Sequence, residues 1–126
     1  MDLLGSLVRV LLPVAILHAT AFAADESAAR GRKIFESRCA TCHEGSPPST
    51  ATLGPSLPGI VGRKAGTGKS GVHSRALAES GIVWNREVLR RYLSNPGREV
   101  PGTIMPVRVE DPKQLEDLLD YLETLH

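Results

Sequence analysis

Apolar residues recur with a helical period in several parts of this chain. The clearest stripe is at the C-terminus, where an i, i+3, i+4, i+7 spacing predicts one buried helical face, made of Leu115, Leu118, Leu119, Leu122 and Leu125. The opposite face is acidic and is expected to face solvent, with Glu116, Asp117, Asp120 and Glu123. Asp111 is suited to cap this helix and Pro112 to open it, because the first helical turn needs no N–H from proline.

A second stripe predicts a helix over residues 86–94. Asn85 is its expected N-cap, and the inward face carries Val88, Leu89, Tyr92 and Leu93. Pro96 should end this helix, since the residue before a proline is disfavoured in the α region.

Weaker signals complete the predicted elements. A first helix is expected over residues 26–38, capped by Asp25 or Ser27, with Ile34 and Phe35 facing inward. A helical turn is expected over residues 74–80, stopped by Gly81. No segment shows a convincing strand pattern, so the predicted fold class is all-α.

Between the first two helical segments lies a long stretch rich in Gly, Pro, Ser and Thr, residues 44–71. Its composition predicts a loop. A loop of this length inside a compact domain is usually functional, and here it could wrap a bound cofactor.

The N-terminus has the pattern of an export signal. An apolar run from Val10 to Phe22 is followed by a possible cleavage site, Ala21-Phe22-Ala23. The alternative is an uncleaved membrane anchor, but the run is shorter than the roughly 20 residues of a spanning helix. We expect residues 1–23 to be a cleaved signal peptide and residues 24–126 to form a single domain.

The net charge of the chain excludes few classes of function. The formal net charge is +1, which favours neither nucleic acid nor a strongly acidic partner. The distribution is uneven: nine Lys/Arg lie between positions 63 and 108, and six acids face one lysine from position 110 onward. This indicates either a dipolar surface or simply a solvated acidic helix.

The strongest chemical signal is Cys39-Ala40-Thr41-Cys42-His43. Two thiols three positions apart, followed directly by histidine, are the attachment signature of a c-type haem. Each thiol adds to one haem vinyl group, and the adjacent imidazole reaches the iron. A covalently held, apolar haem would also support the small core of a domain of about 100 residues that is poor in aromatic residues.

Three other interpretations of the cysteine pair are weaker. A structural zinc site wants four ligands, usually from two such pairs, and this chain has two cysteines in all. A thioredoxin-like redox pair would follow a strand in a βαβ context, which the sequence lacks. A disulfide between cysteines so close together would constrain the unfolded chain little.

The iron would need a second axial ligand. Met105 is the single methionine beyond Met1, and it lies between prolines in a rigid loop, Pro101-Gly-Thr-Ile-Met-Pro106. A lone methionine is ordinarily core packing. Beside a haem motif we predict that Met105 is the ligand, with His73 or His126 as substitutes.

These motifs, in this order, resemble class I cytochrome c, close to the mitochondrial and bacterial carriers. The resemblance runs from Gly31 to Leu122. It implies that the N- and C-terminal helices cross where Gly31 and Phe35 meet Leu118 and Tyr121, and that short middle helices and long loops surround one covalent haem.

The resemblance also implies roles for single residues. The carbonyl of Pro55 would accept a hydrogen bond from His43, a contact that fixes the ligand's tautomer. Arg63 and Trp84 would bind a buried haem propionate. Tyr92 would lie near the methionine sulfur, with Thr103 in the ligand loop.

The chain departs from the family pattern at His73, Ile104 and Val107, and it lacks the family's usual glycine between Val107 and Asp111. His73 stands where relatives usually have a tyrosine that meets a propionate, so it could keep a hydrogen bond there or titrate. Ile104 replaces a commonly basic residue, and Val107 replaces a common aromatic near the haem edge. These changes affect the expected docking surface, not the expected haem.

The implied function is a periplasmic single-electron carrier with one haem c, ligated by His43 and Met105, and no catalytic site. We expect a monomer without nucleic-acid binding or membrane insertion, which docks transiently with redox proteins. Steering could come from basic residues if they gather near the haem edge: Arg86, Arg90, Arg91, Arg98 and Arg108. The alternatives are a haem enzyme or sensor with a labile sixth ligand, and an electron-accepting subunit of a dehydrogenase or reductase.

Overall fold

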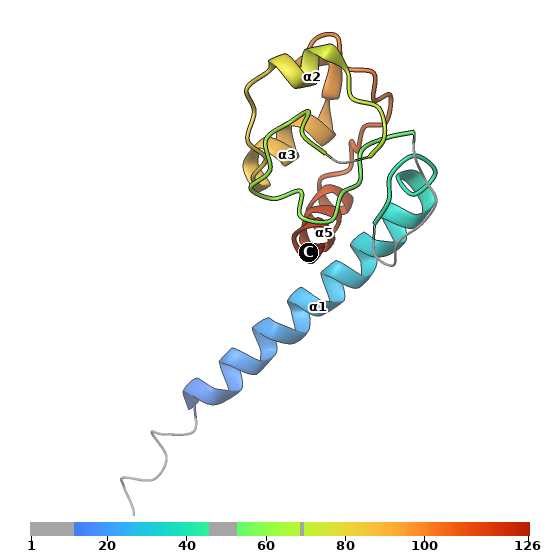
Figure 1. The fold of residues 1–126 in the computed structure, drawn as a ribbon. Helices are drawn as coiled ribbons and strands as arrows, with labels where there is room; N and C mark the ends of the chain where they lie inside the picture. Colours follow the sequence, from blue (N-terminus) through green and yellow to red (C-terminus); the bar gives the residue numbers. More distant parts are fainter. Residues whose placement is uncertain (1–11, 46–52, 69) are drawn as a thin grey trace, which may run out of the picture.

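A computed structural model describes residues 12–45, 53–68 and 70–126, with only the backbone described for 12–20. The helices in these ranges are α1 (Leu12–Arg38), α2 (Arg75–Glu79), α3 (Arg86–Ser94), α4 (Pro96–Glu99) and α5 (Pro112–Glu123) (Figure 1). Within the described residues there is no strand, only an isolated bridge between Lys64 and Val83. The predicted all-α class is confirmed.

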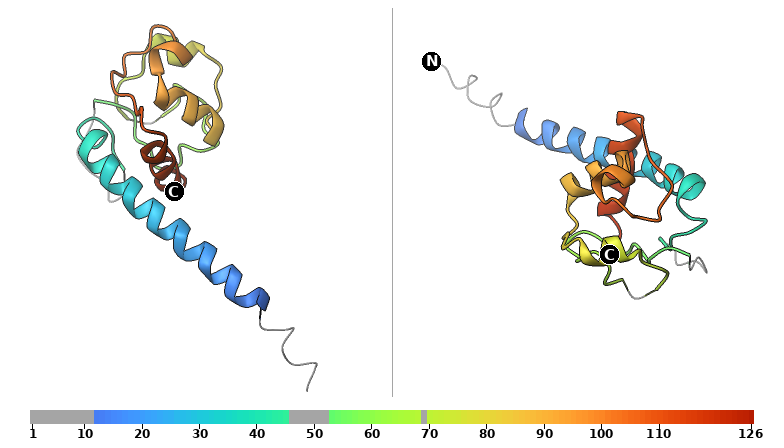
Figure 2. Two further views of the ribbon diagram at one scale, coloured as in Figure 1. Left: turned by 180° about the vertical axis from the view of Figure 1, so that it is seen from behind. Right: turned by 90° about the horizontal axis from the view of Figure 1, so that it is seen from above.

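The start of the first helix was predicted wrongly. α1 runs without a break from Leu12, so neither Asp25 nor Ser27 caps it. The reason is local propensity: the sequence from position 15 to 29 contains seven alanines, the strongest helix former. The N-terminal part of α1 projects away from the other helices (Figures 1 and 2). No helix in the described ranges has both the length and the apolar character of a membrane span.

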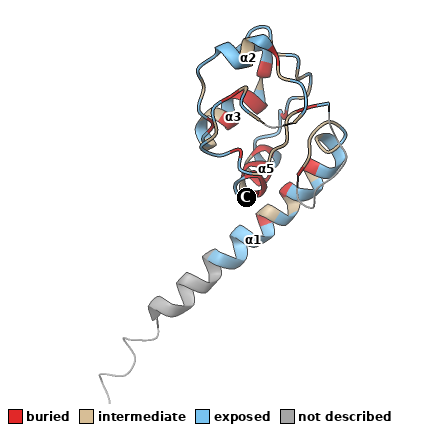
Figure 3. Cartoon of the chain, in the orientation of Figure 1, coloured by how far each residue is buried: buried red, intermediate tan, exposed pale blue. Residues whose placement is uncertain are grey.

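α1 and α5 cross through a contact that only glycine permits. A Cβ built on Gly31 would lie 1.8 Å from the carbonyl oxygen of Asp117 and 2.9 Å from the Cβ of Tyr121. The Phe35 and Tyr121 rings meet beside it, with centroids 5.4 Å apart. Among the α1 residues from 21 to 38, whose burial the structure describes, Ser27, Gly31 and Phe35 are buried and are spaced by one turn. Figure 3 shows the buried parts of α1 where the helix passes α5. The predicted helix crossing is confirmed.

One acid of α5 does not face solvent as predicted. Asp117 is 4% exposed. Two hydrogen bonds reach its carboxylate from the Arg30 guanidinium, at 2.9 and 3.1 Å, and the Lys113 ammonium donates to it at 2.5 Å. Asp117 lies at the crossing, and these cations compensate a carboxylate that would otherwise be costly to bury.

Many of the unevenly distributed charged residues form ion pairs with one another within the chain. Arg86 of α3 forms 2.8 Å ion pairs with three acids of α5, Glu116, Asp120 and Glu123. Arg90 pairs with Glu116 at 2.6 Å. The basic middle and the acidic end therefore meet as ion pairs between α3 and α5, with the paired carboxylates still partly exposed to solvent.

The predicted caps of α3 and α5 are confirmed: the side chains of Asn85 and Asp111 accept hydrogen bonds from backbone N–H groups at the starts of these helices. The side chain of Ser74 caps α2 in the same way, which was not predicted. Pro96 ends α3 as predicted but also opens the short α4, which was not predicted. The leucine stripe is buried throughout, from Leu115 in α5 to Leu125 just beyond the end of this helix. The helices thus enclose one core, and the loops between them form the walls of a cavity.

Candidate haem site

A cavity of about 270 Å³ lies between the loops and the inner faces of α3 and α5. Both cysteines of the motif line it, together with His43 and Met105. The other candidate residues also line it: Pro55, Arg63, Trp84, Tyr92 and Thr103. None of the described residues around this cavity is acidic, and most are apolar. The fold thus brings together every site residue that the sequence predicted.

The two thiols are presented by the turn that follows α1. The amide of Cys42 donates to the carbonyl of Cys39 at 3.0 Å, and the amide of His43 donates to the same carbonyl at 2.9 Å. Both cysteines are free thiols and half-buried. Burial raises the pKa of Cys39 to about 11, so its thiol stays protonated.

His43 is oriented by one hydrogen bond and one close contact. Its Nδ1 lies 2.8 Å from the carbonyl oxygen of Pro55. Because a carbonyl can only accept, Nδ1 carries the proton, and burial lowers the pKa of His43 against the opposing effect of this bond. A Cβ on Gly54 would lie 2.5 Å from the ring, so glycine is needed there. Neutral His43 therefore keeps a free lone pair on Nε2.

Met105 is half-buried in the loop between α4 and α5, where it contacts the core. On the N-terminal side of Met105, the hydroxyl of Thr103 is hydrogen-bonded to the hydroxyl of Tyr92, with the two oxygens 2.6 Å apart. On the C-terminal side, the amide of Val109 donates to the carbonyl of Leu93 at 2.8 Å. The methionine is therefore carried by a segment that α3 holds on both sides.

Arg63 and Trp84 are neighbours across a backbone pairing. The amide of Trp84 donates to the carbonyl of Arg63 at 2.9 Å. The Arg63 guanidinium donates to the carbonyl of Ser56 at 2.7 Å, and burial lowers its pKa. The Trp84 ring meets the edge of Tyr92, with centroids 5.1 Å apart. The half-buried guanidinium of Arg63 thus lines a largely apolar cavity.

The positions that depart from the family pattern also lie on this cavity. Nε2 of His73 donates to the carbonyl of Gly68 at 3.2 Å, so its other ring nitrogen is left for a further contact. Ile104 is 63% exposed and Val107 is half-buried, and both line the cavity. Exposed Leu53 and Val72 line it too. Apolar side chains therefore form much of its outer edge.

One lining residue was missed by the sequence reasoning. Arg38, the last residue of α1, lines the cavity and reaches the loop of Met105. The available signal was its place directly before Cys39, where a basic residue also suits a helix C-terminus. A contact with a segment 70 residues away has no signature in one sequence.

The alternatives to a haem lose support. Cys39 and Cys42 do not form a disulfide, and the described chain has no strand before them. No group of three or more His, Cys, Asp or Glu in the described ranges could hold a metal ion. Two thiols, an imidazole and a thioether on one apolar cavity instead match what a c-type haem requires.

Comparison with known proteins agrees with this geometry. The profile of the family named Cytochrome c matches residues 28–126. The chain belongs to the cytochrome c family. Cytochrome c type-1 of Ascaris suum is 40% identical over 94 residues, 74% of this chain and 83% of the relative. Cytochrome c2 of Blastochloris viridis is 37% identical over 102 residues, 80% of either chain.

A solved structure has the same fold. Cytochrome cH from Methylobacterium extorquens superposes with a TM-score of 0.67 at 39% identity, covering 77% of this chain and 97% of that one. Membership of the family means that this protein is an electron carrier with a covalently attached c-type haem. The predicted family, fold and cofactor are confirmed.

Proposed function

We propose that this cytochrome c is an exported single-electron carrier whose haem is bound through Cys39 and Cys42, with His43 and Met105 as axial ligands. The observation that carries the proposal is the meeting of these four side chains on one apolar cavity. The bound haem supplies the redox chemistry by cycling between ferric and ferrous iron. The chain supplies the ligands, the low-polarity surroundings and the hydrogen bonds that set the potential.

His43 suits the proximal position. Its tautomer, fixed by Pro55, leaves Nε2 unprotonated, which is the form that binds a metal. The close fit between Gly54 and the ring limits its rotation.

Met105 suits the opposite position. A thioether is a soft, uncharged ligand, and Met/His ligation raises the reduction potential of a haem. The contacts of Thr103 and Val109 on either side of Met105 would limit how far the sulfur can move.

Arg63 and Trp84 are the proposed binding residues of a haem propionate. Arg63 has no acidic partner among the described ion pairs, although it is half-buried in a largely apolar wall. A carboxylate beside it would complete the pairing that buried charges require. His73 lies on the same cavity, and its Nδ1 is left to accept a further hydrogen bond.

No substrate site is required by this function, because both axial positions of the iron would be filled by the chain. We therefore propose a carrier and not an enzyme. We also propose that residues 1–23 are removed on export to the periplasm and that the mature protein is a monomer. In support, Asp25 and Glu26 would then lie in the first turn of α1, where acids are favourable.

The proposed partners are redox proteins that dock transiently at the cavity's outer edge. The lining of the cavity gives no support to the steering role considered for five arginines. None of Arg86, Arg90, Arg91, Arg98 and Arg108 lines the described cavity. Arg86, Arg90 and Arg91 instead pair with acids of α3, α4 and α5, and Arg108 pairs with Glu110. Exposed apolar Leu53, Val72 and Ile104 border the cavity instead.

The test is Met105→Ala in exported, haem-loaded protein. We expect the haem to stay attached, the potential to fall, and the weak sulfur-to-iron absorption of the ferric form to vanish. Ile104→Ala, which changes the adjacent exposed residue, should keep that absorption. If Met105→Ala leaves both the spectrum and the potential unchanged, Met105 is not the ligand.

Attachment and export have a separate test. Mass spectrometry of the exported protein should give a chain starting near Ala24 plus one haem, with no thiol reactive at Cys39 or Cys42. Two reactive thiols in exported protein would contradict the attachment. Copurification with a dehydrogenase or reductase would favour a dedicated subunit over a free carrier.

A further inference from the structure

The loop that carries Met105 has few backbone contacts of its own. In the part of the chain that the structure describes, no backbone N–H from Ile104 to Arg108 donates to another backbone carbonyl. The fixed points are Thr103, bonded to Tyr92, and Val109, bonded to Leu93. The sulfur-bearing stretch therefore depends on side-chain contacts for its position.

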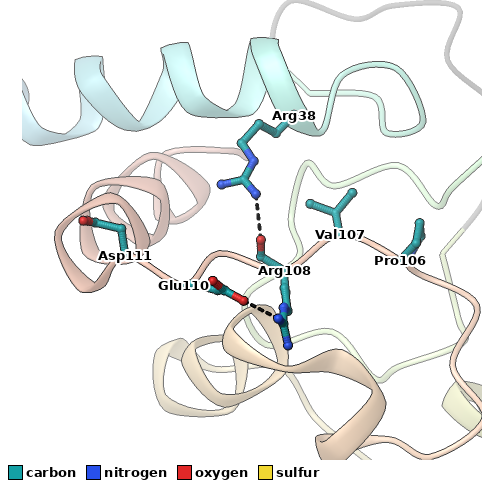
Figure 4. Close-up of a pocket in the computed structure, with 6 residues that line it drawn as sticks. All are labelled: Arg38, Pro106, Val107, Arg108, Glu110 and Asp111. Carbon is teal, nitrogen blue, oxygen red and sulfur yellow. Dashed lines mark hydrogen bonds and ion pairs between the residues drawn. The ribbon is translucent and has the colours of Figure 1, made fainter.

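One such contact comes from the far end of α1. Nη2 of Arg38 donates to the backbone carbonyl of Arg108 at 2.7 Å, as Figure 4 shows. The side chain of Arg108 takes no part, since its guanidinium pairs with Glu110. Arg38 also lines the surface pocket formed with Pro106 and Val107, and it lines the haem cavity. The Arg38 side chain thus connects the end of α1, directly before Cys39, with the loop that follows Met105.

We propose that Arg38 is a positioning residue that holds the Met105 loop closed over the haem. This rests on the proposed function, because it takes Met105 as the axial ligand. The Arg108 carbonyl belongs to the same peptide unit as the Val109 amide that donates to Leu93, so Arg38 and Leu93 together hold this end of the loop. An opening of the loop that moves this end away from α1 breaks the Arg38–Arg108 bond, so the bond shifts the equilibrium toward methionine ligation.

The chemistry of the contact favours arginine. A guanidinium makes charge-assisted hydrogen bonds, which are stronger than neutral ones. The C-terminus of α1 carries a partial negative charge that stabilises a cation at its last residue. Because the acceptor is a main-chain carbonyl, the side chain at position 108 can change without loss of the bond.

The experiment measures how readily an external ligand displaces the methionine. Imidazole is titrated into ferric, haem-loaded protein while the sulfur-to-iron absorption is followed. Arg38→Met removes the donors and the charge but keeps an unbranched helix-forming side chain. We expect imidazole to bind about threefold to tenfold more tightly, a modest gain because the lost bond is exposed to solvent.

Arg108→Ala is the matched control. It removes a positive charge from the same place but leaves the carbonyl acceptor, so imidazole affinity should stay near wild type. An equal gain in both variants would show an effect of charge and overturn the proposal. Wild-type affinity in Arg38→Met would overturn it as well.

Two further variants keep the test decisive. The side chain in Arg38→Gln is too short to reach the Arg108 carbonyl, so this variant should show the same gain in imidazole affinity as Arg38→Met. It replaces Arg38→Met if that variant fails to take up haem. Met105→Ala separates the two proposals. If it abolishes the absorption while the Arg38 variants behave as wild type, only the role of Arg38 is wrong. If it changes nothing, the ligand assignment itself fails.

Discussion

Replacing Gly31 by alanine tests the helix crossing on which the cavity depends. The added methyl carbon would lie 1.8 Å from the carbonyl oxygen of Asp117, whereas ordinary contacts begin at 3.4 Å. The obstacle is backbone of α5, which no side-chain rotation can relieve. One helix must therefore move by more than about 1 Å, which also disturbs the packing of Phe35 on Tyr121 and the Arg30–Asp117 pair.

Two opposing effects decide the size of the change. Overpacking of a close contact costs about 1–3 kcal/mol and occasionally more. Alanine gains about 1 kcal/mol over glycine in helix propensity. Because the clash is with backbone, we place the cost at the upper end and expect a net loss of about 1–2 kcal/mol in the free energy of unfolding. Gly31→Leu should lose more, since it adds volume at the same point.

The assay is denaturant unfolding of the haem-loaded protein, with Gly97→Ala as the matched control. Gly97 lies in α4, and a Cβ there meets no atom within 4 Å. Its substitution should be neutral or stabilise by up to about 1 kcal/mol. A Gly31→Ala protein as stable as Gly97→Ala would refute the steric argument.

Three further changes test the buried carboxylate, the ligand loop and the histidine. Hydrogen bonds from Arg30 lower the pKa of Asp117 in the folded protein. Ionised Asp117 therefore stabilises the fold at pH values above the pKa of an unfolded aspartate, and this stabilisation is lost as the pH falls through the pKa of Asp117 in the folded protein. Unfolding measured from neutral pH to acid should show the stability gap between wild type and Asp117→Asn closing below about pH 4, and a constant gap would contradict this. Thr103→Val leaves a buried tyrosine hydroxyl without its partner and should lower the free energy of unfolding by about 1–3 kcal/mol, so an unchanged value would be evidence against that bond. Gly54→Ala should press on the His43 ring and lose about 1–3 kcal/mol, with wild-type stability counting against the close fit.

Much of the fold could be predicted because its signals are local. Capping residues such as Asn85 and Asp111 act within one turn, and the leucine stripe of α5 marks its buried face directly. The haem site could be predicted for a similar reason, because its main signals are also local. The haem motif occupies five consecutive residues, and Met105 is the single methionine of the proposed mature chain. The resemblance to a family then supplied Pro55, Arg63 and Trp84, which periodicity alone does not indicate.

The contacts that escaped prediction all depend on which helices meet. Asp117 has the sequence context of a solvent-facing acid, and it becomes buried only because Gly31 brings α1 against α5 at that turn. The arginines of α3 were considered as steering residues near the haem edge, yet Arg86 pairs with three acids of α5 that lie one turn apart. A charge pattern along one chain records which groups are available for pairing, but not their distances. The same limit hid Arg38, whose partner is a main-chain carbonyl and so leaves no side-chain signature at position 108.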